Sequence, residues 1–225
     1  MGIHITGVGS YIPSHKEKNQ DFLAHTFLDD SGKPFGADNG DIIEKFKAIT
    51  GIEERRYAKS HQTASDLAFL AAEKAIEDAS LDPETLDYII VAHNFGDIQH
   101  GCIQTDMLPS LATRVKYNLQ IKNPNCVAYD LIFGCPGWVE GVIQAKAFIK
   151  SRMAKRCLVI GADTLSRIAD QYDRDAMIFA DGAGATIIEE TEEAGGLLSH
   201  SSHTYSTEEA FYLFSGQSNA PTANP

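Results

Sequence analysis

The chain has 225 residues, 43% of them apolar, and a formal net charge of −12 at pH 7. This apolar content is enough for a substantial core in one or two domains. A nucleic-acid-binding protein would carry a basic face, and the sequence shows none. No apolar run approaches the length of a membrane span. We therefore expect neither nucleic acid nor a membrane as a partner.

The N-terminus and the cysteines bear on the cellular compartment. Residues 1–7 have neither the basic segment nor the long apolar stretch of a signal peptide. The four cysteines have no regular spacing, so they predict neither a disulfide framework nor a zinc site. We expect a reducing, cytoplasmic compartment, no metal and no cofactor.

An acidic partner would need a local basic patch on so acidic a chain. Two stretches offer positive charge: the pair Arg55 and Arg56, and a later stretch at a predicted helix end. The later stretch contains Lys146, Lys150, Arg152, Lys155 and Arg156. Part of it is typical of an ordinary solvated helix C-terminus, because cations there interact favourably with the helix dipole.

The first third of the chain mixes strand and helix patterns. Asp41 and Glu44 resemble a capping box, in which two side chains satisfy free N–H groups at a helix start. Thr63 and Asp66 form the same pattern ahead of a longer amphipathic segment. The predicted elements are a strand at 3–9, a loop or cap region at 14–40, a short helix at 41–49 and a helix at 63–80.

The middle of the chain predicts a layered α/β domain. Residues 87–92 form a continuous apolar run, typical of a strand in a parallel sheet covered on both faces. The helix predicted at 135–150 is apolar almost all round, so we expect it to be buried between two layers. Strand–helix–strand repetition favours this architecture. The further predicted elements are a helix from Pro109 to about 119 and strands at 126–132 and 157–162.

The C-terminal part has a different pattern. Residues 177–180 and 185–188 are apolar and β-branched, and the glycine-rich residues 181–184 lie between them. This pattern predicts two strands around a glycine turn. Residues 216–225 are small, polar and contain proline, which predicts a disordered tail.

Cys135 is the most informative residue of the sequence. It lies where an apolar strand turns abruptly into an apolar helix. A thiol at a helix N-terminus lies near unpaired N–H groups and the positive end of the helix dipole, which both favour the nucleophilic thiolate. Pro136 suits the first helical position, and Gly134 and Gly137 leave room for a substrate carbonyl. A buried small residue at a tight junction is the alternative interpretation.

The three other cysteines occupy less suitable places. Cys126 opens an apolar strand and Cys157 lies inside another, so both are interpreted as small core residues. Cys102 lies in a loop-like stretch.

Other motifs are weaker. Residues 181–184 lack the full dinucleotide-binding pattern and are followed by a strand rather than a helix. His200 and His203 form an isolated H-x-x-H without a third ligand, which is typical of a surface loop. A Cys–His hydrolase with His93 or His100 as base is a further hypothesis, because His93 ends a predicted strand and His100 lies nearby in a loop. The nucleophile elbow lacks its first glycine, however, and a structural His93 is the favoured interpretation.

Six short motifs together point to a family. They are residues 7–13 (GVGSYIP), 50–56 (TGIEERR), 87–92 (DYIIVA), Cys135 with its helix, 159–163 (VIGAD) and 179–185 (FADGAGA). In order and spacing they resemble the N-terminal half of ketoacyl-ACP synthase III, a thiolase-fold condensing enzyme. The resemblance implies a thiolase-like layered α-β-α fold, truncated after the first half and the opening strands of the second. We place the half-domain at 1–170, the opening strands at 171–215 and the tail at 216–225.

The resemblance implies an acyltransferase of fatty-acid or polyketide-like biosynthesis. In that family, the cysteine matching Cys135 accepts an acyl group from acyl-CoA or from acyl-ACP, an acyl group on acyl carrier protein. Malonyl-ACP is then decarboxylated, and its carbanion attacks the acyl-enzyme. The backbone N–H of Cys135 is placed to stabilise the oxyanion of acyl transfer. The family is homodimeric, and the residue at the position of Leu108 reaches the partner's acyl tunnel.

The chain departs from the family pattern in two places. Bacterial members carry a tryptophan and an arginine that hold the CoA adenine, and Lys45 and Ile49 stand at these positions here. A longer or carrier-bound acyl donor is therefore an alternative to acetyl-CoA. Pro136, Gly137 and Trp138 also replace the family's commoner small residues after the cysteine, so we expect a different pocket shape.

The family's catalytic histidine and asparagine belong to its second half. His203 and Asn219 do not stand in the matching motifs. Condensation needs hydrogen-bond donors to the developing enolate, so we expect this chain alone to be inactive in condensation. Two alternatives stay open: a non-catalytic half-domain for dimerisation or carrier-protein binding, and a Cys–His thioester hydrolase.

Overall fold

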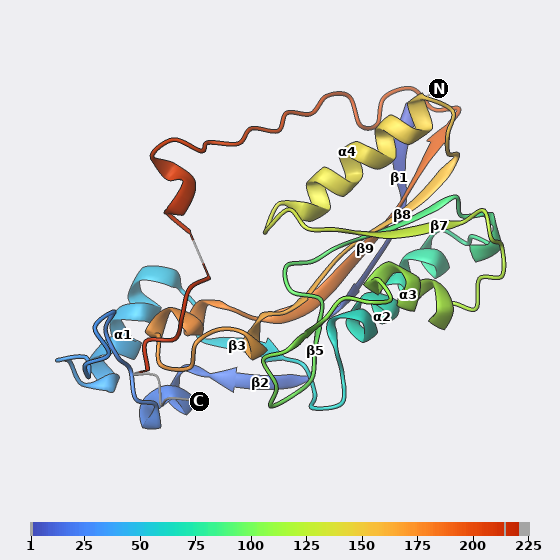
Figure 1. Cartoon of the computed structure of the whole chain (residues 1–225). Coiled ribbons are helices and arrows are strands. Elements are labelled where there is room, and N and C mark those ends of the chain that lie inside the picture. Colours follow the sequence, from blue (N-terminus) through green and yellow to red (C-terminus); the bar gives the residue numbers. More distant parts are fainter. Residues whose placement is uncertain (1, 214, 221–225) are drawn as a thin grey trace.

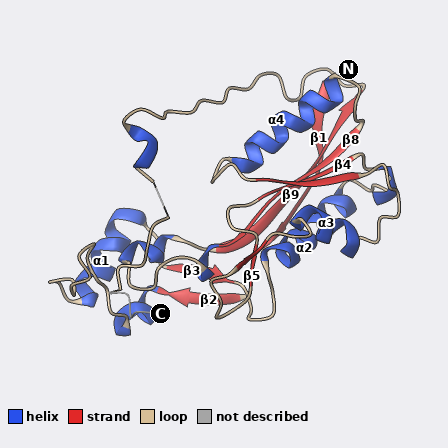
Figure 2. Ribbon diagram, in the orientation of Figure 1, coloured by secondary structure: helices blue, strands red, loops and turns tan. Residues whose placement is uncertain are grey.

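A five-stranded sheet in the order β1–β9–β8–β4–β7 forms the centre of the fold (Figures 1 and 2). The computed structural model describes residues 2–213 and 215–220. β4 pairs in parallel with both β7 and β8, whereas β9 runs antiparallel to its neighbours β8 and β1. The strands are β1 (Gly2–Tyr11), β4 (Tyr88–Ala92), β7 (Val127–Leu131), β8 (Arg156–Thr164) and β9 (Asp181–Thr191).

Helices cover both faces of this sheet. α2 (Ala64–Asp78) and α3 (Leu111–Asn118) pack on one face, and α4 (Gly137–Lys150) packs on the other (Figure 1). Successive side chains of a strand point to opposite faces. Accordingly, Ile89 of β4 packs in the α2–α3 core and Ile90 in the α4 core. The layered α/β arrangement predicted from the sequence is confirmed.

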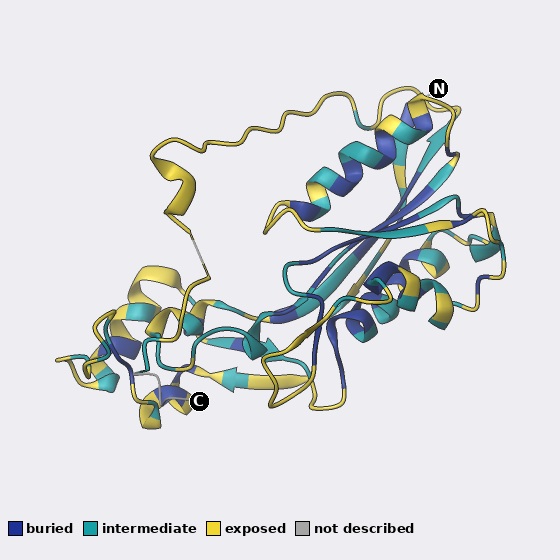
Figure 3. Cartoon of the chain, viewed as in Figure 1, coloured by how far each residue is buried: buried dark blue, intermediate teal, exposed yellow. Residues whose placement is uncertain are grey.

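The surroundings of α4 differ from the expectation. The sheet covers one side of this helix, but Val139 on the helix is 49% exposed. Figure 3 shows exposed residues along α4 beside buried ones. Within the described residues, α4 is therefore covered by one layer and not by two.

A small lobe lies at one end of the sheet (Figure 1). Residues 14–40, expected as a loop or cap, contain β2 and a short 3-10 helix, and the helix that follows begins earlier than expected. Asp38, and not Asp41, caps it by accepting a hydrogen bond from the N–H of Gly40. The lobe consists of β2 (His15–Lys18), the 3-10 helix Asn19–Ala24, α1 (Asn39–Thr50) and β3 (Glu54–Tyr57). Its core consists of Phe22, Phe27, Ile42, Ile43 and Met177.

The predicted strand pair around residues 181–184 is wrong. The single strand β9 runs through these residues, and a 3-10 helix, Arg174–Ile178, precedes it. Gly182 and Gly184 are not among the glycines with positive φ, so they form no left-handed turn. β9 is paired on both sides with strands from earlier in the chain. The expected domain boundary at residue 170 stays a prediction.

The remaining elements are short. They are β5 (Asp97–Ile98), β6 (Thr105–Asp106) and the 3-10 helices Pro83–Thr85, Leu165–Arg167 and Glu209–Phe211. No helix in the described part of the chain is long and apolar enough to cross a membrane. Of the tail expected at 216–225, residues 221–225 lie outside the described residues. Ser218 and Asn219 both hydrogen-bond to the carboxylate of Asp170.

Candidate functional site

A sharp turn between β7 and α4 carries Cys135. Gly134 has a φ of 68°, a left-handed conformation that glycine adopts without strain. The N–H of Gly137 donates to the carbonyl of Gly134 at 3.0 Å and closes the turn. The helix begins at Gly137 with Pro136 as its N-cap, so Pro136 stands one position earlier than predicted. Cys135 therefore lies just ahead of the helix, and it is exposed.

Two glycines bring the start of α4 close to the sheet. A Cβ atom on Gly137 would lie 2.9 Å from Cβ of Ala92. One on Gly141, a turn later, would lie 2.7 Å from Cγ1 of Val159. No larger residue fits at these positions without movement of its neighbours. The glycines thus let the start of α4 pack closely against the end of β4 and the middle of β8.

Cys135 lines a hollow of about 260 Å³. Residues 92–93 at the end of β4, 161–163 near the end of β8 and 182–184 at the start of β9 form its other walls, together with Gly134 and Trp138. Ligand sites in sheets of this kind form at the carboxyl ends of parallel strands. The hollow is therefore the candidate active site.

The buried cysteines differ from Cys135 in their surroundings. Cys126 and Cys157 are buried, as predicted. Burial raises the pKa of both thiols, that of Cys157 to about 12, because a thiolate is poorly solvated there. Neither thiol has the exposure or the thiolate population of a nucleophile. Cys102 is exposed but does not line the hollow.

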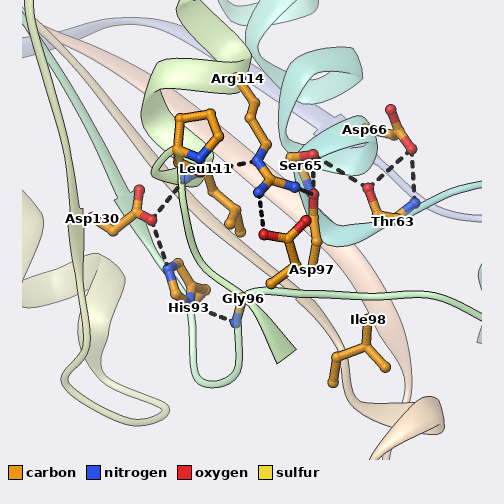
Figure 4. A network of polar contacts seen from close by, with 12 residues as sticks. Thr63, Ser65, Asp66, His93, Gly96, Asp97, Ile98, Leu111, Arg114 and Asp130 are labelled. Atoms are coloured by element: carbon orange, nitrogen blue, oxygen red, sulfur yellow. Dashed lines mark hydrogen bonds and ion pairs between the residues drawn. The ribbon is translucent and has the colours of Figure 1, made fainter. Parts of the chain in front are cut away.

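His93 lines the same hollow, but both of its ring nitrogens have partners within the protein (Figure 4). The N–H of Gly96 donates to Nδ1 at 3.0 Å, so Nδ1 is an acceptor. Nε2 lies 3.0 Å from Oδ2 of Asp130 and donates to it. No free nitrogen is left to accept a proton from Cys135. The arrangement supports the structural interpretation of His93 and does not favour a Cys–His hydrolase.

Asp163, which was not predicted from the sequence as a site residue, also lines the hollow. Its carboxylate lies in the wall of the hollow, and both oxygens accept hydrogen bonds from Asn94. Burial raises the pKa of Asp163 above its usual value, although the Asn94 hydrogen bonds act in the opposite direction. A carboxylate that directly follows a buried strand was the available signal, within the VIGAD motif.

A polar network fixes the loop that leads from the hollow to α3 (Figure 4). Asp97 accepts two hydrogen bonds from Ser65, and Arg114 bridges Asp97 and Asp106 at 2.7 Å each. Leu108, two residues further on, is 86% exposed and does not line the hollow. Its expected place in a tunnel concerns a partner protomer and stays a prediction.

The two candidate basic stretches are only partly exposed and only partly paired with carboxylates. Arg55 is buried, and Arg56 pairs with Glu54. In the second patch Lys146 is buried, while the guanidinium groups of Arg152 and Arg156 pair with carboxylates of β9 at 2.6 and 2.7 Å. Lys150 and Lys155 are exposed and belong to none of the ion pairs found among the described residues, so only part of the second stretch is left as a candidate basic patch.

The remaining candidate positions lie away from the hollow. Lys45 and Ile49, which replace the family's adenine-binding pair, are both exposed on α1. His203 is exposed, and its Nε2 hydrogen-bonds to Ser201. Among the described residues, no group of three or more His, Cys, Asp or Glu side chains is arranged to hold a metal ion.

Comparison with known proteins finds one matching family model and several similar synthases. Residues 129–206, which include the Cys135 turn and the start of β9, match the model of the family 3-oxoacyl-[acyl-carrier-protein] synthase III. The chain is 39% identical over 197 residues to β-ketoacyl-[acyl-carrier-protein] synthase III 1 of Vibrio vulnificus, covering 87% of this chain and 55% of that protein. It is 37% identical over 201 residues to the synthase III of Staphylococcus haemolyticus, covering 89% and 57%.

Solved structures give the same result for the fold. The synthase III of Aquifex aeolicus superposes with a TM-score of 0.70 at 33% identity, covering 85% of this chain and 55% of that one. The enzyme of Thermus thermophilus gives 0.69 at 32% identity, covering 86% and 53%. The thiolase-like fold is thus established, and the chain spans about half the length of the relatives it matches.

Proposed function

Because the chain belongs to the ketoacyl-ACP synthase III family, we propose that it is the N-terminal half of a condensing acyltransferase, with Cys135 as acyl acceptor. The observation that carries the proposal is the exposed Cys135 thiol at the mouth of the hollow, directly ahead of α4. Free N–H groups at this helix start are available to stabilise an oxyanion.

The proposed half-reaction is an acyl transfer. The thiolate of Cys135 attacks the carbonyl carbon of an acyl thioester, and a tetrahedral oxyanion forms. Collapse of this intermediate releases the donor thiolate, which takes a proton, and leaves the acyl group on Cys135. The acyl donor is acyl-CoA or acyl-ACP, and malonyl-ACP is the second substrate of the complete enzyme.

Condensation requires groups outside these 225 residues. An enolate develops on the malonyl thioester as carbon dioxide leaves, and it needs hydrogen-bond donors. His93 is occupied by Asp130 and Gly96 and is not available as such a donor. We therefore expect acylation without condensation from this chain alone. We place the complete enzyme in fatty-acid or related biosynthesis, as a cytoplasmic homodimer with Leu108 near the partner's acyl site.

Intact-mass measurement tests the acyl transfer. The chain is incubated with butyryl-CoA and, separately, with the butyryl thioester of N-acetylcysteamine, and the adduct is located by peptide mapping. We expect a mass gain of one butyryl group on Cys135 and none at this position in Cys135→Ala. The exposed Cys102 reports non-specific acylation in the same molecule. If Cys135 reacts with iodoacetamide but never with either thioester, the acyl-acceptor role is wrong, and a non-catalytic half-domain becomes the better explanation.

A further inference from the structure

The wall of the Cys135 hollow contains one fixed carboxylate, that of Asp163. The backbone N–H of Asn94 donates to Oδ1 at 2.9 Å, and its side-chain Nδ2 donates to Oδ2 at 2.6 Å. Both donors belong to one neutral residue, so they hold the carboxylate in place without cancelling its charge. None of the ion pairs found among the described residues includes Asp163.

The other residues around the hollow do not compensate this charge. Apart from Cys135 and His93, they are glycines, alanines and Trp138. His93 turns its Nε2 to Asp130 and its Nδ1 to Gly96, so neither nitrogen pairs with Asp163. A group that fills a hollow of about 260 Å³ next to Cys135 therefore lies close to an uncompensated carboxylate.

From this arrangement, and on the premise of the proposed function, we propose that Asp163 selects the acyl group by charge. Cys135 accepts uncharged acyl groups, and Asp163 excludes acyl groups that end in a carboxylate, such as the succinyl group. Two like charges inside such a water-accessible hollow repel each other, and at a separation of about 6 Å and an effective dielectric constant of about 40, between those of a protein surface and bulk water, this disfavours the anionic ligand by about tenfold.

The charge effect concerns the entry of the acyl donor and leaves the chemistry of transfer unchanged. For either donor the sulfur–carbonyl bond to Cys135 forms, the sulfur–carbonyl bond to the donor thiol breaks, and the donor thiol leaves with the proton. The two donors differ in the far end of the acyl chain, a methyl group in butyryl and a carboxylate in succinyl. The change in their rate ratio at Cys135 between the wild type and a variant without the Asp163 charge therefore isolates the effect of charge in the hollow.

The first experiment compares these two donors on the 225-residue chain. Butyryl and succinyl thioesters of N-acetylcysteamine are supplied at equal concentration, and adduct formation at Cys135 is followed by mass spectrometry. In the wild type we expect the butyryl rate to exceed the succinyl rate by about tenfold. In Asp163→Asn this ratio should fall towards one. Asp30→Asn removes the same charge at an exposed position of the lobe and should keep the wild-type ratio.

The second experiment does not depend on acyl transfer. Cys135 is alkylated with iodoacetamide, which is neutral, or with iodoacetate, which is anionic, and the rate ratio is compared with the ratio at Cys102 in the same molecule. Asp163→Asn should raise the relative iodoacetate rate at Cys135 several-fold and leave the ratio at Cys102 unchanged. If thioesters give no adduct, the proposed function fails, and this measurement still decides the role of Asp163.

A structural role of Asp163 predicts a different result. Loss of packing would change the neutral and anionic rates together and leave their ratio at the wild-type value. Such an outcome in Asp163→Asn, with Cys157 still unreactive as a sign of an intact core, would overturn the inference. Asp163→Ser is the second neutral variant if the asparagine variant does not fold. Asp163→Glu keeps the charge and should keep the discrimination.

Discussion

Asp130 connects three parts of the chain through one side chain. Its Oδ1 accepts the N–H of Ala112, and its Oδ2 accepts the N–H of Leu111 and Nε2–H of His93. The first two are free N–H groups of the first turn of α3, which have no acceptor within the helix. Asp130 lies on β7, only a few residues before the Cys135 turn. It therefore fixes the start of α3 and the end of β4 relative to the site.

Replacing Asp130 by alanine should destabilise the protein strongly. Loss of the acceptor for two N–H groups at the start of α3 costs about 1 kcal/mol, and the His93 N–H left without an acceptor in a buried place costs about 1–3 kcal/mol more. We expect the free energy of unfolding to fall by about 2–4 kcal/mol in urea titrations followed by circular dichroism. Asp30→Ala, at an exposed aspartate, serves as the control and should change stability little. A loss below about 0.5 kcal/mol in Asp130→Ala would contradict the capping role.

Some residues of the site could be predicted from the sequence, and others could not. Cys135 could be found because its signal is local: a strand, a glycine and a proline ahead of an apolar helix. The role of Asp163 depends on Asn94, which is far away along the chain, and that of Asp130 depends on α3 and His93. No local pattern contains such contacts. The structural role of His93 was anticipated, but its two partners required the folded arrangement.

At the level of elements, α4 directly follows the Cys135 turn and packs close to the sheet. Gly141 lies opposite Val159 of β8 and Ile90 of β4. Both are buried, β-branched residues with restricted rotamers, so they have little freedom to move aside. The distance between helix and sheet is therefore set by the absence of a side chain at this position.

Gly141→Ala should destabilise the protein although alanine favours helix. The gain in helix propensity is about 1 kcal/mol. The added Cβ would lie 2.7 Å from Cγ1 of Val159, and overpacking of a core usually costs about 1–3 kcal/mol. We expect a net loss of stability, and slower alkylation of Cys135 as α4 moves away from the sheet. Gly36→Ala is the matched control, because nothing lies within 4 Å of its added Cβ. Increased stability of Gly141→Ala in thermal unfolding would refute the close-packing argument.

Secondary-structure elements were predicted correctly where a local sequence pattern determines them, and wrongly where pairing with distant strands determines them. β4, α2 and α4 were predicted well because burial of one or both faces imposes a periodicity on the sequence. The strand pair at 177–188 was wrong because a glycine-rich run has the composition of a turn. In β9, however, Gly184 is extended and pairs with Ser10 on one side and Gly161 on the other. Pairing with strands distant in sequence decided the conformation.

The whole molecule leaves apolar surface uncovered on the α4 side of the sheet. Val8 of β1 is 56% exposed and lines a second hollow with Trp138 and Gly161. Phe133 and Val139, on either side of Cys135, are 41% and 49% exposed. Several exposed apolar residues on one side of a sheet indicate a place where another protein surface packs. The chain spans about half the length of the relatives it matches, and we expect a further protein surface to pack on this side of its sheet.

The same surface predicts self-association of the 225-residue chain. Burying a valine side chain that is otherwise in water contributes about 1.5–3 kcal/mol, so two copies gain by covering Val8 and Val139. We expect dimers or larger species at micromolar concentration in size-exclusion chromatography with light scattering. Val8→Glu combined with Val139→Glu should shift the chain towards monomer, because association would then bury two carboxylates. Ile49→Glu changes an exposed apolar residue of the lobe, 74% exposed, and should leave the association unchanged. A wild-type chain that stays monomeric throughout this range would argue against an uncovered packing face.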